Sequence, residues 1–108
     1  MELKGRNIAI TGAGQGIGRA IAESLAAQGA RLALLDISEA GLTATAAACA
    51  ELGAEARSYV LNVADEAAVD SVMAAVAQDL GSLHGLVNNA GITRDGLLLK
   101  FKEGEVVG

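Results

Sequence analysis

The feature that most constrains the fold is a regular alternation of short apolar runs with longer segments of helical periodicity. The runs are 7–11, 31–36, 56–63 and 83–90, and we interpret them as buried strands. The predicted helices between them cover about 16–28, about 39–52, and a segment from Asp65 to about Leu80. Strands and helices in this order, with short connections, are typical of parallel strands joined by crossovers. We therefore predict an α/β fold, a doubly wound parallel sheet of Rossmann type, of which the chain holds the first four strands and three helices.

The predicted helices carry their own start and stop signals. Ile17, Ile21 and Leu25 recur at intervals of four residues and form one face of the first helix. Ser38 and Asp65 are the predicted N-caps of the second and third helices. A glycine follows each predicted helix, at the position where a helix commonly ends.

A glycine-rich stretch, TGAGQGIG, fills residues 11–18 between the first predicted strand and the first helix. In such a turn Gly12 permits a sharp reversal of the backbone. Gly16 lets the chain approach a pyrophosphate, and Gly18 lets helix and strand pack closely. These glycines permit a nucleotide site, but on their own they also suit a plain tight turn, and methyltransferases use a comparable loop.

The start of the first helix supplies candidate phosphate donors. Free backbone amides near Gln15, Gly16 and Ile17 could donate hydrogen bonds to phosphates, and Gly14 belongs to the same predicted cofactor loop. No lysine follows the last glycine, which excludes a nucleoside-triphosphate P-loop.

An acidic residue, Asp36, ends the second predicted strand, 18 residues after the last glycine of the loop. A carboxylate there can accept hydrogen bonds from both hydroxyls of an adenosine ribose and would repel a 2′-phosphate. Ile37 belongs with Asp36 to the predicted cofactor site. A cation at position 15 or 37 would help to bind a 2′-phosphate, but neither Gln15 nor Ile37 is basic, and Arg19 and Arg31 could act only by folding back. We predict NAD(H) as the cofactor in preference to NADP(H); the alternative is a capping or surface aspartate.

These features together resemble the N-terminal half of the short-chain dehydrogenase/reductase family. The segments that carry the resemblance are TGAGQGIG (11–18), Asp36, LNVAD (61–65) and NNAG (88–91). The stretch NNAGITRDGLLLK is similar to bacterial 3-oxoacyl-acyl-carrier-protein reductases within that family. The resemblance covers essentially the whole chain.

The resemblance also implies where further parts of a cofactor would lie. Asn62 and Val63 would flank the adenine, with Asn62 meeting its exocyclic amine. Asn89, Ala90 and Gly91 would line the nicotinamide ribose. All of these residues follow predicted strands, at the edge where open α/β sheets bind ligands. Asn88, by contrast, would brace its strand through a hydrogen bond to neighbouring backbone.

The activity that the resemblance implies is NAD(H)-dependent hydride transfer between nicotinamide and a secondary alcohol or ketone. A 3-oxoacyl thioester is a candidate substrate, with a role in fatty acid biosynthesis. The family uses a tyrosine with a lysine four residues later, whereas the one tyrosine here, Tyr59, is followed by Val63 at that place. We therefore assign no catalytic residue and expect the chain alone to be inactive.

The domain organisation follows from this incomplete site. We expect 1–91 to be the N-terminal dinucleotide-binding half of a Rossmann domain. Residues 92–108 would be an irregular tail that leads into a missing C-terminal half carrying catalysis. The parent enzyme would be a homo-oligomer. The alternative is a non-catalytic nucleotide-binding fragment or module.

Composition excludes other classes of protein. The net charge of −5 gives no general attraction to nucleic acid. No apolar run approaches the roughly 18 residues of a membrane span, and Glu2, Lys4 and Arg6 interrupt any signal peptide, so we expect a cytoplasmic protein. The single cysteine, Cys49, is predicted to be a small buried residue, and His84 to have a strand-entry role. No metal site is predicted.

Overall fold

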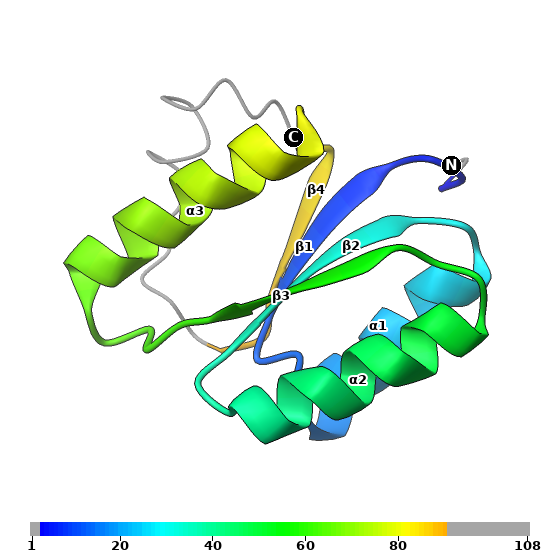
Figure 1. Cartoon of the computed structure of the whole chain (residues 1–108), viewed down its shortest axis with the longest axis horizontal. Coiled ribbons are helices and arrows are strands. Elements are labelled where there is room, and N and C mark those ends of the chain that lie inside the picture. The colour runs from blue at the N-terminus through cyan, green and yellow to red at the C-terminus, as the bar shows by residue number, and fades with distance from the viewer. Residues whose placement is uncertain (1–2, 91–108) are drawn as a thin grey trace.

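The computed structural model of the chain describes residues 3–90, and the strands and helices alternate in the predicted order (Figure 1). The strands are β1 (Asn7–Thr11), β2 (Arg31–Asp36), β3 (Ala56–Val60) and β4 (Gly85–Asn88). The helices are α1 (Gly16–Ala27), α2 (Glu39–Glu51) and α3 (Glu66–Leu80). Gly91 and the predicted tail, 92–108, lie outside the described residues.

The sheet is parallel throughout, in the order β3-β2-β1-β4. Helices α1 and α2 cover one face and α3 covers the other, as Figure 1 shows. This arrangement confirms the predicted α/β fold with a parallel sheet wound on both faces. The strands that lie between two neighbours, β1 and β2, are buried almost throughout because helices cover both of their faces.

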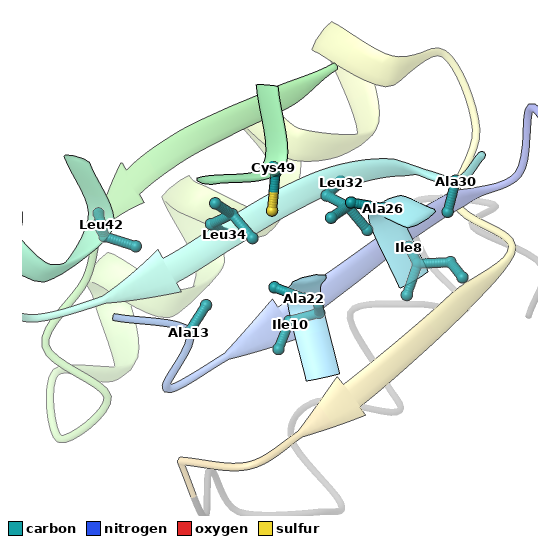
Figure 2. Close-up of a cluster of buried hydrophobic side chains, with 10 residues drawn as sticks. All are labelled: Ile8, Ile10, Ala13, Ala22, Ala26, Ala30, Leu32, Leu34, Leu42 and Cys49. Atoms are coloured by element: carbon teal, nitrogen blue, oxygen red, sulfur yellow. The ribbon is translucent and has the colours of Figure 1, made fainter. Parts of the chain in front are cut away.

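The core has two layers, one on each face of the sheet. Figure 2 shows the layer beneath α1 and α2, where Ile10 of β1 and Leu34 of β2 pack with Leu42 and Cys49 of α2. The opposite layer joins Leu35 of β2 and its neighbours to the buried face of α3. The alternation of the two sets along each strand follows from the two-residue period of side chains in a strand.

The predicted N-caps of α2 and α3 are confirmed. Ser38 Oγ accepts a hydrogen bond from the Gly41 amide at 3.0 Å, and Asp65 Oδ1 accepts one from the Ala68 amide at 3.1 Å. Each bond satisfies an amide that has no partner within its helix. The predicted burial of Cys49 is also confirmed, since its exposed fraction is 0%.

The third strand is shorter than predicted, ending at Val60 rather than at residue 63. The Leu61 amide still donates to the Asp36 carbonyl at 2.9 Å. The next residue turns away, because Asn62 Oδ1 accepts a hydrogen bond from the Ala64 amide at 3.0 Å. This local side-chain bond competes with strand pairing and ends the strand.

The fourth strand is also shorter than the predicted 83–90. At its start, the His84 amide donates to the Asn7 carbonyl at 2.8 Å, and His84 Nδ1 accepts from the Asn7 amide at 2.9 Å. A ring nitrogen therefore replaces the expected backbone acceptor, in keeping with the strand-entry role of His84. At the other end, the Ala90 amide donates to Thr11 Oγ1 at 3.0 Å rather than to a carbonyl.

Candidate functional site

The carboxyl ends of all four strands meet at one edge of the sheet, because the strands are parallel. A hollow of about 230 Å³ lies at this edge, and its lining residues are Gly12, Asp36, Ile37, Leu61, Asn62, Val63 and Ala90. All of them except Leu61 were singled out from the sequence as cofactor-binding candidates. The fold thus brings together residues that are far apart in the chain.

Leu61 is the lining residue that sequence reasoning missed. It is almost fully buried and packs in the core layer beneath α3, so its apolar character has a structural explanation. The available signal was its place directly before Asn62, at the end of a strand that delivers its neighbours to the hollow.

The glycine-rich loop runs back against both the helix and β4. Gly12 has a φ of 67°, in the left-handed region that favours glycine. A Cβ on Gly18 would overlap the Gly12 carbonyl oxygen and would lie 2.7 Å from its carbonyl carbon. The absence of a side chain at Gly18 therefore permits the predicted close approach of α1 to the end of β1.

The N-terminus of α1 differs from those of the other two helices. No side chain of its N-cap residue, Gln15, accepts a hydrogen bond there, whereas Ser38 and Asp65 cap α2 and α3. Ile17, in the first turn of the helix, is 71% exposed. The uncapped amides and the positive end of the helix dipole favour an anion at this place.

Asp36 accepts backbone hydrogen bonds through both of its carboxylate oxygens, one from the glycine-rich loop and one from the N-cap of α2. Oδ2 accepts a hydrogen bond from the Gly14 amide at 2.8 Å, and Oδ1 accepts one from the Ser38 amide at 2.9 Å. A carboxylate has about four lone-pair sites, so each oxygen can still accept a further donor. The carboxylate that lines the hollow is thus held in place by backbone on both sides.

The two arginines that could have folded back toward Asp36 are engaged elsewhere. Arg19 forms an ion pair with Glu23 at 2.8 Å along α1, and Arg31 forms one with Glu55 at 3.3 Å. Arg31 also donates to Asn7 Oδ1 at 3.2 Å, at the opposite edge of the sheet from the hollow. Neither cation therefore offsets the negative charge of Asp36.

The asparagines at the end of β4, Asn88 within the strand and Asn89 directly after it, both contact the end of β1 or the residue that follows it. Asn88 Oδ1 accepts a hydrogen bond from the Thr11 hydroxyl at 3.1 Å. Asn89 Nδ2 donates to the Gly12 carbonyl at 3.3 Å. Together with the bond from the Ala90 amide to Thr11, these contacts join the end of β4 to the start of the glycine-rich loop.

Tyr59, the single tyrosine of the sequence, lies in β3, and its hydroxyl donates to Asp79 Oδ2 of α3 at 2.8 Å. Burial, the hydrogen bond to Asp79 and the charge of that carboxylate raise the pKa of Tyr59 to about 12. The phenol therefore keeps its proton at neutral pH and joins the third strand to a helix.

Two further properties of residues 3–90 bear on function. Within this part of the chain, no group of three or more His, Cys, Asp or Glu side chains is placed to hold a metal ion. None of the helices described is both long and apolar enough to cross a bilayer.

Comparison with known proteins places these features in context. The sequence model of the short chain dehydrogenase family matches residues 6–107. The 3-oxoacyl-[acyl-carrier-protein] reductase FabG of Escherichia coli K12 is 45% identical over 105 residues, which cover 97% of this chain and 42% of that enzyme. The chain therefore spans less than half the length of this relative.

Solved structures agree with the sequence comparison. An NAD⁺-bound xylitol dehydrogenase is 40% identical with a TM-score of 0.77, over 80% of this chain and 33% of that one. Levodione reductase is 33% identical with a TM-score of 0.83, over 96% of this chain and 50% of that one.

Proposed function

Because the chain belongs to the short-chain dehydrogenase family, we propose that it binds a nicotinamide dinucleotide at the carboxyl ends of its strands. The bound cofactor would transfer hydride to or from a secondary alcohol or ketone. The observation that carries this proposal is the convergence of the glycine-rich loop, Asp36 and the Asn62–Val63 turn on one hollow.

The hollow suits one part of a dinucleotide. Its volume of about 230 Å³ lies below the roughly 300–1,000 Å³ of sites that enclose a whole drug-sized ligand. We propose that it takes the adenosine, with Asp36 and Ile37 on the ribose and Asn62 and Val63 beside the adenine. The diphosphate would lie at the uncapped N-terminus of α1, over Gly14, Gln15, Gly16, Ile17 and Gly18. The nicotinamide ribose would lie toward Asn89, Ala90 and Gly91.

The charge around Asp36 supports NAD(H) over NADP(H) as the cofactor. A 2′-phosphate on the ribose would meet the carboxylate, and like charges at contact repel. The Ser38 amide at the start of α2, which could otherwise donate to such a phosphate, already donates to Asp36. The 40% identical xylitol dehydrogenase was solved with NAD⁺ bound.

The substrate proposal rests on the relatives. Similarity to 3-oxoacyl-[acyl-carrier-protein] reductase supports a 3-oxoacyl thioester as the carbonyl substrate, and hence a role in fatty acid biosynthesis. We assign no proton donor within this chain, because the Tyr59 hydroxyl is bonded to Asp79. A cytoplasmic location and a homo-oligomeric parent enzyme complete the proposal.

Titration of the chain with NADH and NADPH, followed by calorimetry, tests the cofactor site. We expect NADH to bind more tightly than NADPH, and Asp36→Asn to narrow that difference because it removes the repelling charge. Glu39→Gln is the matched control, since it removes an equal charge from an exposed position in the first turn of α2. Binding of neither dinucleotide, or tighter binding of NADPH by the unmodified chain, would contradict the proposal.

A further inference from the structure

Helix α2 contacts the glycine-rich loop through a buried hydroxyl. Thr45 is 0% exposed, and its Oγ1 donates to the Ala13 carbonyl at 2.9 Å, across 32 residues of sequence. A threonine within a helix commonly bonds to a carbonyl of its own preceding turn. Thr43 does so in the same helix, where its hydroxyl donates to the Glu39 carbonyl at 3.0 Å. The Thr45 hydroxyl is directed to the loop instead.

A glycine one turn earlier brings α2 close enough for this bond. A Cβ on Gly41 would lie 2.6 Å from the Gly14 carbonyl oxygen and 3.1 Å from the Gly14 Cα. Residues 41 and 45 lie on the same face of the helix, because they are four positions apart. This face of α2 therefore packs directly on the backbone of the loop.

The contacts fix the loop segment that leads into α1. The Ala13 amide donates to the Leu35 carbonyl at 3.1 Å, and its carbonyl accepts from Thr45. The Gly14 amide donates to Asp36 at 2.8 Å. The next residue, Gln15, is the N-cap of α1 and provides no side-chain cap. Thr45 thus holds the backbone directly before the amides that would meet a diphosphate.

We infer that Thr45 is a positioning residue for the diphosphate part of the cofactor site, acting through the Ala13 carbonyl; this inference rests on the proposed function. The hydroxyl orders the loop before any ligand arrives, and a loop already in its binding conformation loses less entropy on binding. Without the hydroxyl, a buried carbonyl loses its partner and the loop relaxes to find another.

The test compares Thr45→Val with Thr43→Val, which makes the same change at an exposed position of the same helix. The probes are NADH, ADP and adenosine, so that the diphosphate is present in two of them and absent from the third. We expect Thr45→Val to weaken the binding of NADH and of ADP about tenfold, the order expected from the loss of one hydrogen bond. Adenosine should keep its affinity, and Thr43→Val should bind all three normally.

Conservative replacement separates positioning from general stability. Thr45→Ser keeps the hydroxyl and should restore most of the affinity for NADH and ADP. If Thr45→Val is too unstable to study, Gly41→Ala gives the second test. Its methyl group would displace Gly14 and should weaken the binding of ADP more than the binding of adenosine. Equal weakening of all three ligands would show a merely structural role and overturn the inference.

A measurement without ligand distinguishes failure of this inference from failure of the proposed function. Hydrogen exchange of the Gly14 amide should be about tenfold faster in Thr45→Val than in the unmodified chain, and unchanged in Thr43→Val. Unchanged exchange in Thr45→Val would overturn the positioning role. Faster exchange in a chain that binds none of the three probes would instead overturn the proposed function, and the diphosphate role with it.

Discussion

Replacement of Gly18 by alanine tests the close approach of α1 to the end of β1. The added methyl group would overlap the Gly12 carbonyl oxygen and lie 2.7 Å from its carbonyl carbon. Carbon atoms in contact are usually about 3.5–4.0 Å apart, so helix and loop must separate by roughly 1 Å. The two nearest atoms are backbone, which cannot move aside as the end of a flexible side chain can.

The expected loss of stability follows from three terms. Overpacking of this kind costs about 1–3 kcal/mol. Displacement of Gly12 also breaks the hydrogen bond that its carbonyl accepts from Asn89, at about 1 kcal/mol. Alanine regains about 1 kcal/mol over glycine within a helix, which offsets that loss. We therefore expect Gly18→Ala to lower the free energy of unfolding by about 2 kcal/mol.

Urea unfolding followed by circular dichroism measures this change, and thermal unfolding should show a drop in Tm of roughly 10 °C. Gly85→Ala is the matched control, because a Cβ there would lie 3.8 Å from Ile8, an ordinary contact distance. It should change the free energy of unfolding by no more than about 0.5 kcal/mol. Native stability in Gly18→Ala, or an equal loss in Gly85→Ala, would refute the argument from close approach.

Two further predictions concern titrating side chains. The pKa of Tyr59 is raised to about 12 in the folded chain, above the value of about 10 expected when unfolded, so folding tightens the hold on the proton. Its contribution to stability should therefore be complete below about pH 10 and lost as the pH rises toward about 12, and Tyr59→Phe should lack this loss. The absorbance of tyrosinate reports the single tyrosine directly, and titration of the native chain near pH 10 would contradict the prediction. Burial is the main cause, and the negative charge of Glu23 the second, of the raised pKa of the Cys49 thiol. A disulfide reagent should therefore label Cys49 only as the chain unfolds in urea, and rapid labelling of the native chain would contradict its burial.

The sequence predicts most of the element order because the signals for it are local. The caps at Ser38 and Asp65 depend on residues three positions apart, and both hydrogen bonds form as expected. The strand ends are less predictable, because they depend on competition from side chains. Asn62 ends β3 by bonding to the Ala64 amide, and the Thr11 hydroxyl takes the amide that would have extended β4.

The candidate site shows the same division between local and distant signals. Spacing and resemblance were sufficient to select Asp36 and Asn62, and the fold brings both to one hollow. The bond between Asp36 and the Gly14 amide was not predicted, nor was the bond from Thr45 to the Ala13 carbonyl. These contacts depend on how closely α2 packs on the loop, and that distance is set by tertiary packing rather than by any local pattern.

The two hydrogen bonds of Asp36 have a consequence for how such a chain could change its cofactor. The same carboxylate holds the loop amide of Gly14 and the amide of Ser38, the N-cap of the following helix. A replacement of Asp36 chosen only to accommodate the 2′-phosphate of NADP(H) would leave both amides without their acceptor. A successful redesign, in evolution or in the laboratory, must therefore supply a new oxygen for the loop at the same time as it removes the charge.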